Sequence, residues 1–321
     1  MEESSKASTS SLSFIVEQVQ AEPEPPHEAV FLVLAYLPVY ELLVMSQVCT
    51  SLRDAVNDDV LPWLNVIVER PLNSRLSDEI LMKITSKANG RLKTLALMNC
   101  IHITDEGLQR VVEQNPLINK LHIPACTSLT PEGVLCSVKT LCQMSNCLST
   151  LSLNGIYNLQ KEHLDMLALN LRKNLHLGEQ QPQQPIYYHE RGSISLFKQE
   201  ESHRIIDLEI CPKCFEVRMV YDCPKGMCKM REWPLAHCRG CIFCIPRCEN
   251  CGECIGSEEA EEGACGDILC LECWLKLPKC SFCNKPYCKQ HTSWWCTSSD
   301  SLFLCKVCDE NSHGYTYTDV L

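Results

Sequence analysis

Apolar residues fill positions 29 to 48, a stretch that four other residues interrupt: Pro38, Glu41, Ser46 and Gln47. Proline has no backbone N–H and its ring clashes with the preceding helical turn, so we expect Pro38 to separate two helices. The pattern predicts short helices at roughly 28–36, 40–50 and 52–58. Helices this short cannot bury an apolar surface that runs nearly all round them. Part of that surface is therefore expected to face another protein.

A six-residue motif, apolar-x-x-Glu-x-apolar, recurs downstream at spacings of 27, 26 and 30 residues. Repetition at such a period is typical of a solenoid. Its four copies occupy residues 76–81, 103–108, 129–134 and 159–164. The apolar residues before the second copy predict a short strand with Leu95 and Leu97 on its inner face. Cys100 and Cys126 are expected in the core, and Thr104 is expected to cap the helix that follows.

Cysteines dominate the last third of the chain, where 19 of the 25 lie between residues 211 and 308. Eight C-x2-C spacings occur there, and each directs two thiolates at one point, which is half of a tetrahedral zinc shell. We expect about four zinc ions; iron–sulfur or redox chemistry is a less common use of such pairs in loop-rich segments. The predicted ligands are Cys211, Cys214, Cys223, Cys228, Cys238, Cys241, Cys244, Cys248, Cys251, Cys254, Cys270, Cys273, Cys280, Cys283, Cys288, His291, Cys305 and Cys308.

Charge and composition narrow the classes of partner. The formal net charge is 29 − 40 = −11, which argues against a nucleic-acid partner. The longest apolar run at the N-terminal helices is nine residues, against roughly 20 for a membrane span, so no membrane partner is expected. The chain opens with acidic residues and serines where a secretory signal would carry a basic residue and an apolar core. We therefore expect a nuclear or cytoplasmic protein, whose reduced thiols are free to bind metal.

These patterns predict a multidomain α/β chain in which no catalytic residue can be assigned, because no G-x-S-x-G or G-x4-G-K-[ST] motif occurs. A strand is expected at 204–210. The predicted parts are a disordered tail (1–27), a three-helix module (28–63), repeats (64–177), a linker (178–204), a cysteine-rich zinc-binding domain (205–310) and a C-terminal tail (311–321).

The three-helix module resembles the F-box, which binds the Skp adaptor of SCF (Skp, cullin, F-box) ubiquitin ligases. The residues that carry the resemblance are Leu34, Leu37-Pro38, Glu41-Leu42-Leu43, Val48-Cys49-Thr50, Arg53 and Trp63. The chain departs from the motif where Pro26-His27-Glu28 replaces a leucine–proline pair and where Leu52 replaces the commoner tryptophan. An ordinary helical domain is the alternative. The resemblance implies that the adaptor is contacted by Leu34, Leu37, Pro38, Leu42, Leu43 and Val48.

The repeats resemble the cysteine-containing leucine-rich repeats that often follow an F-box. The whole arrangement is similar to plant F-box proteins of the Skp-interacting-partner type, most closely at residues 211–214, 220–224, 241–244 and 248–252. The resemblance implies a three-helix F-box, a short leucine-rich-repeat solenoid and a small zinc-stabilised C-terminal module. It also implies a non-catalytic subunit of an E3 ubiquitin ligase, which recruits an unidentified protein substrate. Through the Skp adaptor it would join the cullin and the RING subunit.

Two alternatives remain for the cysteine-rich region: a self-sufficient RING-like ligase, or a zinc-dependent protein-interaction scaffold. A RING needs two interleaved ligand sets. The best match supplies seven ligands at short gaps: Cys280, Cys283, Cys288, His291, Cys296, Cys305 and Cys308. Tyr287 and the neighbouring aromatic residues Trp294, Trp295 and Phe303 either anchor a partner or build the core of the zinc fold.

Overall fold

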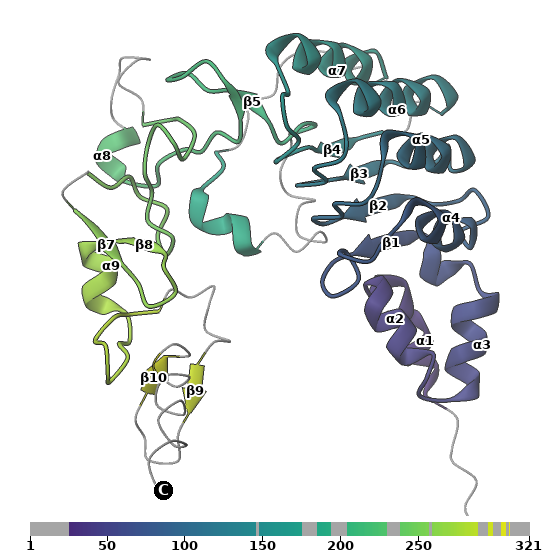
Figure 1. Cartoon of the computed structure of the whole chain (residues 1–321), viewed down its shortest axis with the longest axis horizontal. Coiled ribbons are helices and arrows are strands. Elements are labelled where there is room, and N and C mark those ends of the chain that lie inside the picture. Colours follow the sequence, from purple (N-terminus) through teal and green to yellow (C-terminus); the bar gives the residue numbers. More distant parts are fainter. Residues whose placement is uncertain are drawn as a thin grey trace, which may run out of the picture.

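The computed structural model describes residues 26–145, 148–174, 185–193, 204–229, 238–256, 259–287, 295–297, 303–305 and 308. Figure 1 shows short N-terminal helices at one end of a parallel sheet and a row of longer helices along one face of that sheet. The cysteine-rich part lies on the side of the sheet away from that row of helices, with β5 near β4. None of the described helices has both the length and the apolar character needed to cross a membrane.

Short helices form the N-terminal helical module, residues 26–64. They are α1 (Glu28–Val33), η1 (Leu34–Tyr36), α2 (Val39–Met45), α3 (Thr50–Asp58) and η2 (Leu61–Trp63). Pro38 separates η1 from α2, as the sequence predicts. The second helix ends at Met45, earlier than expected, and the Ser46 hydroxyl donates to the Leu43 carbonyl at 2.7 Å where it ends. Trp63 is buried at 1% exposure and donates its ring N–H to the Val56 carbonyl at 2.7 Å, which fixes α3 against the start of the sheet.

Four parallel strands follow in the order β1-β2-β3-β4, and a helix follows each of them. The strands are β1 (Asn65–Val68), β2 (Thr94–Leu97), β3 (Lys120–His122) and β4 (Thr150–Ser152). The helices are α4 (Asp78–Ser86), α5 (Asp105–Gln114), α6 (Pro131–Met144) and α7 (Lys161–Asn174). We call this part the strand–helix layer.

The core of the strand–helix layer lies between the sheet and its helices. Leu95 and Leu97 are fully buried there, as predicted, and Leu95 lies in register with Leu121 of the next strand. Cys100 and Cys126 are also fully buried, and the Cys126 thiol donates to the Leu97 carbonyl at 3.2 Å. Both cysteines are core residues, as expected.

In the strand–helix layer, hydrogen bonds join α4 to the start of α5, and α5 to the start of α6. Thr104 caps α5 as predicted, because its hydroxyl accepts from the Gly107 N–H at 3.2 Å. The Asp78 carboxylate at the start of α4 accepts from the Thr104 N–H at 3.0 Å and from its hydroxyl at 2.6 Å. Asp105 and Thr130 repeat the arrangement between α5 and α6, with distances of 2.9 and 2.6 Å.

The free edge of β4 is covered by residues 205–207. The Leu151 N–H donates to the Ile205 carbonyl at 2.7 Å, and Leu151 and Ile206 form a parallel bridge. The Asp207 carboxylate accepts from the N–H groups of Leu153 at 2.8 Å and Asn154 at 3.2 Å. The strand expected at 204–210 is thus present as this bridge and, further on, as β5.

Short elements connect the cysteines of the C-terminal part. They are η3 (Tyr188–Ser193), β5 (Glu209–Ile210), β6 (Val217–Arg218), α8 (Gly226–Lys229), β7 (Ala260–Glu262), β8 (Ile268–Cys270), α9 (Leu271–Lys276), β9 (Trp295–Thr297) and β10 (Phe303–Cys305). They form three two-stranded antiparallel sheets, β5–β6, β7–β8 and β9–β10. Elements this short leave little apolar core, so the cysteine clusters must supply much of the stability.

Candidate metal centres and docking surface

Sixteen of the predicted ligands gather into four groups of four cysteines, which we call centres 1 to 4. Centre 1 is Cys211, Cys214, Cys241 and Cys244; centre 2 is Cys223, Cys228, Cys238 and Cys254. Centre 3 is Cys248, Cys251, Cys270 and Cys273; centre 4 is Cys280, Cys283, Cys305 and Cys308. The other two predicted ligands, Cys288 and His291, lie outside the described residues.

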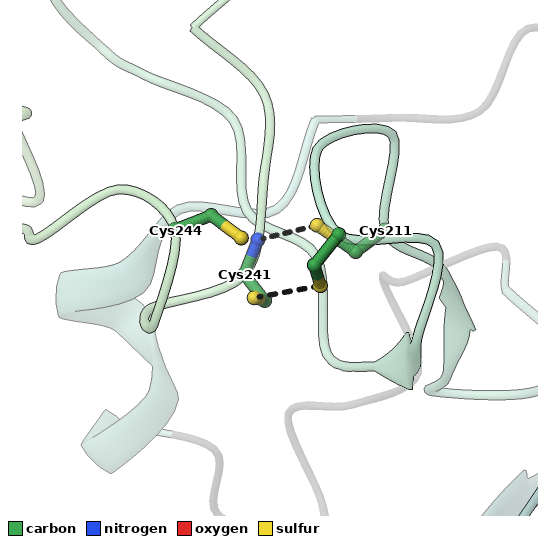
Figure 2. A group of neighbouring side chains, drawn as sticks. Cys211, Cys241 and Cys244 are labelled. Carbon is green, nitrogen blue, oxygen red and sulfur yellow. Dashed lines mark hydrogen bonds between the residues drawn. The ribbon is translucent and has the colours of Figure 1, made fainter.

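The sulfur atoms of each centre fit a tetrahedral metal ion. Within a centre they all lie within 4.8 Å of one another, and one sulfur–sulfur distance in each of centres 1 to 4 is 3.8, 3.8, 3.8 and 3.9 Å, respectively. Four thiolates at about 2.3 Å from a zinc ion would be about 3.8 Å apart, whereas a disulfide needs about 2.05 Å. Figure 2 shows Cys241 and Cys244 of centre 1, which share one loop, facing Cys211 from another loop.

Backbone N–H groups favour the thiolate form at the first cysteine of several centres. The Cys241 N–H donates to the Cys211 sulfur at 3.4 Å, and the Cys305 N–H donates to the Cys280 sulfur at 3.3 Å. Burial acts to raise the pKa of Cys211 and of Cys280, but such hydrogen bonds outweigh it and lower each pKa to about 6. At Cys248 a hydrogen bond with Cys251 lowers the pKa to about 5. Each of these three centres therefore holds a ready thiolate near neutral pH, the form that binds zinc.

The centres interleave along the chain. The overlapping run 238, 241, 244 is divided, because Cys238 belongs to centre 2 while Cys241 and Cys244 belong to centre 1. The run 248, 251, 254 is divided in the same way between centres 3 and 2. The sequence identifies these cysteines as ligands, but two of its eight C-x2-C spacings, 238/241 and 251/254, do not form a common half-site.

The alternative of a RING-like ligand order at residues 280–308 does not match the grouping of the described cysteines. Interleaving would place Cys280 and Cys283 in a different site from Cys305 and Cys308, yet all four share centre 4. β9 and β10 pair antiparallel, and the backbone N–H of Cys305, the last residue of β10, donates to the Cys280 sulfur. Tyr287 is 1% exposed and packs in the small core beside centre 4, so it is a core residue.

Residues 185–193, part of the expected linker, contact the cysteine-rich region. We call them the strap. Tyr188 is 5% exposed, and its hydroxyl donates to the Glu249 carboxylate at 2.7 Å. The Ile186 N–H donates to Asp222 at 3.1 Å, and a Cβ on Gly252 would lie 2.3 Å from the His189 ring. The sequence of this stretch contains no periodic signal for these contacts, which join residues up to 63 positions apart.

Arg204 and Arg239 form ion pairs where the strap, the sheet edge and centre 1 meet. Arg239 contacts Asp222 at 2.9 Å and Glu209 at 2.5 Å, and the buried Arg204 pairs with Glu209. A buried guanidinium is stable only when it is paired in this way.

The N-terminal helical module leaves an apolar surface exposed, which we call the docking patch. It comprises Leu32, Val33, Tyr36, Tyr40, Leu43, Val44 and Val48. The adaptor-facing role predicted for Leu43 and Val48 is compatible with their exposures of 40% and 66%, and Leu37 and Pro38 are half-buried. The adaptor contact predicted for Leu34 and Leu42 does not fit the structure. These side chains are 1% and 0% exposed and pack in the core, where they cannot touch a partner directly.

Comparisons with known proteins agree with this division of the chain. The F-box domain model matches residues 26–64, and the model described as At3g27290 F-box protein C-terminal domain matches residues 207–282. F-box protein SKIP28 of Arabidopsis thaliana is 43% identical over 282 residues, which cover 86% of each chain. F-box protein SKIP14 is 36% identical and F-box protein At3g27290 is 35% identical, both from the same plant. The matches cover 79% and 77% of this chain, and 55% and 65% of those longer relatives. This chain, with its N-terminal F-box and its cysteine-rich C-terminal region, therefore belongs to the F-box protein family.

Proposed function

We propose that this chain is the substrate-recruiting subunit of an SCF-type E3 ubiquitin ligase. The observation that carries the proposal is the docking patch, which leaves large apolar side chains exposed on a module that matches the F-box domain. Val48 and Leu32 are 66% and 72% exposed. Exposed apolar residues gathered on one small module mark a protein-interaction site. The Skp adaptor is the partner that the F-box implies, with Leu37, Pro38, Leu43 and Val48 among the contacts.

As such a subunit the chain performs no bond chemistry. The adaptor would connect it to the cullin and, through the cullin, to the RING subunit and its ubiquitin-charged conjugating enzyme. Holding a target protein beside that enzyme converts a rare encounter into an effectively intramolecular reaction. The chain would act in the nucleus or the cytoplasm, with neither nucleic acid nor a membrane as its partner.

The remaining parts would hold the target. We assign the strand–helix layer to a short leucine-rich-repeat solenoid, because parallel strands, buried leucines and capped helices recur in it in register. Centres 1 to 4 would bind one zinc ion each, which makes the cysteine-rich region rigid. Phenylalanines at its cysteine turns are 76% to 77% exposed and suit contact with a target: Phe215, Phe243 and Phe282.

Adaptor binding tests the proposal. The double substitution Leu43→Arg and Val48→Arg places two charges in the docking patch, while the core contacts of Leu34 and Leu42 stay intact. We expect the affinity of the full chain for purified Skp adaptor, measured by titration calorimetry, to fall roughly 100-fold, or about 3 kcal/mol. Leu117→Arg, at a 46% exposed site outside the F-box, is the control and should bind normally. Unchanged affinity of the double variant would show that the docking patch is not the adaptor contact.

A further inference from the structure

Centre 2 is assembled differently from the other three centres. Centres 1, 3 and 4 each consist of two C-x2-C pairs, whose tight turns bring two sulfurs together locally. Centre 2 contains no such pair, since Cys223, Cys228, Cys238 and Cys254 are separated by 5, 10 and 16 positions. Something other than a local turn must therefore hold its ligands in place.

The Arg247 side chain lies where the segments that supply these ligands meet. It is 1% exposed, and its Nη2 donates to the carbonyls of Tyr221 at 2.8 Å and of Cys238 at 2.9 Å. Tyr221 is two residues before Cys223, and the Arg247 backbone forms an antiparallel bridge with Cys254. One residue thus contacts Cys238, Cys254 and the segment that leads into Cys223.

The charge of Arg247 is not balanced by a carboxylate. Within the described residues, no Asp or Glu forms an ion pair with it, and its Nε and Nη1 have no hydrogen-bond partner. Arg204, which is also buried, differs because it pairs with Glu209. A lone buried guanidinium costs several kcal/mol unless a negative charge lies nearby.

The thiolates of centre 2 can supply that negative charge, because Cys238 and Cys254 are both in contact with Arg247. The guanidinium itself donates to the Cys238 carbonyl, so its positive charge lies beside a ligand of centre 2. A zinc ion bound by four thiolates carries a net charge of −2. The guanidinium can offset part of that charge inside the fold, where electrostatic interactions are strong.

We infer that Arg247 is the positioning residue of centre 2: it joins the segments that carry the ligands and supplies the positive charge that a buried four-thiolate zinc centre needs. The inference rests on the zinc binding proposed above. Residues that support ligands from outside the coordination shell typically change metal affinity 10- to 100-fold.

Zinc content and zinc release of the full chain test this role. Elemental analysis gives the zinc per chain, and transfer to a chromogenic chelator gives the release rates. Arg247→Met should lose one zinc of about four, or release one roughly 10- to 100-fold faster, while the others keep their rates. Arg247→Lys keeps the positive charge but lacks the planar guanidinium, so its zinc release rate should lie between those of the wild type and Arg247→Met. Arg204→Met removes another buried arginine, which is paired with a carboxylate, and this variant should keep all its zinc.

The Cys238→Ser variant identifies the centre that responds. It should lose one zinc, and adding Arg247→Met to it should cause no further loss, because both changes act on centre 2. Wild-type protein without zinc would overturn the zinc proposal itself. Wild type with about four zinc ions and Arg247→Met with unchanged release would overturn only the role of Arg247, as would equal acceleration of all four ions. If Arg247→Met is insoluble, the release rates of Arg247→Lys decide between the same two outcomes.

Discussion

His122 shows how one side chain couples this fold to pH. It lies on β3 in register with Ala96 and Ser152 and is 1% exposed, and neither ring nitrogen has a hydrogen-bond partner among the residues that the structure describes. Burial, aided by the charge of Lys120, lowers the pKa of His122 to about 4. The imidazole is therefore neutral in the folded chain at physiological pH, whereas in the unfolded chain its pKa is about 6.5.

This difference predicts a pH dependence of stability. The contribution of His122 to the free energy of unfolding is fully present above about pH 6.5. It is lost as the pH falls toward 4, because the unfolded chain then binds a proton that the folded chain does not bind. Between pH 7 and 5.5 the wild type should lose about 1 kcal/mol through this residue. Urea unfolding of His122→Leu at both pH values should lack that loss. His102→Gln, at an exposed position, is the control, and equal losses in wild type and His122→Leu would contradict the account.

Residue by residue, the sequence predicts best where a local rule decides the outcome. Thr104 precedes an acidic turn and does cap its helix, and the spacing of Leu95 and Leu97 places both in the core. Leu34 and Leu42 show the limit. The run from residue 29 to 48 is apolar on nearly every side, so it has no period that tells an inward face from an outward one.

At the scale of elements, the link between successive helices explains two glycines in the repeated sequence. A Cβ on Gly107 would lie 2.1 Å from an Asp78 carboxylate oxygen, and a Cβ on Gly133 would lie 2.0 Å from the Asp105 side chain. Glycine is needed here because the carboxylate of the preceding helix occupies the space of a side chain. In the fourth copy the glycine position is held by His163, whose Nδ1 accepts from the Gln160 N–H at 3.1 Å. The histidine thus binds the N–H that corresponds to the one bound by Asp78 or Asp105 in the second and third copies.

Gly107→Ala should consequently destabilise the chain, although alanine favours a helix by up to about 1 kcal/mol over glycine. The methyl group displaces Asp78 from its two hydrogen bonds with Thr104, and we expect a net loss of about 1–2 kcal/mol in denaturant unfolding. In the Asp78→Ala background the clash is absent, so the same substitution should be neutral or stabilising. Equal destabilisation in both backgrounds would refute this explanation. Gly226→Ala, with no atom within 4 Å, is a control.

Centre 4 should behave as an independent unit, because it shares no segment with the interleaved centres 1 to 3. Cys283→Ser should lower the zinc content by one ion per chain and leave adaptor binding unchanged. Elemental analysis and calorimetry check both results. Loss of all the zinc, or of none, would contradict the assignment.

The pairing of ligands shows what sequence spacing leaves open. Three cysteines three residues apart, as at 238, 241 and 244, contain two overlapping C-x2-C turns, and spacing alone does not choose between them. The fold decides, because Arg247 binds the Cys238 carbonyl beside centre 2 while Cys241 lies against Cys211.

On the scale of the whole molecule, the strap and the sheet edge join parts that the sequence presents as separate. Asp207 closes the β4 edge 53 to 54 positions away, and Tyr188 reaches Glu249 in the cysteine-rich region. Such contacts follow from three-dimensional packing and carry no periodicity, so the sequence predicts the succession of modules but not their attachment. These contacts connect the strand–helix layer, which follows the F-box, to the surfaces proposed to hold a target.

Ubiquitin transfer in a purified system tests the central claim most directly. The chain is mixed with ubiquitin, activating enzyme and conjugating enzyme, with or without the Skp adaptor, cullin and RING subunit. We predict transfer, to a bound target or to lysines of this chain, only when the adaptor, cullin and RING subunit are present, and loss of that transfer in the Leu43→Arg, Val48→Arg variant. Robust transfer without the cullin components, abolished by Cys280→Ser with Cys283→Ser, would contradict the account and make the cysteine-rich region itself the ligase.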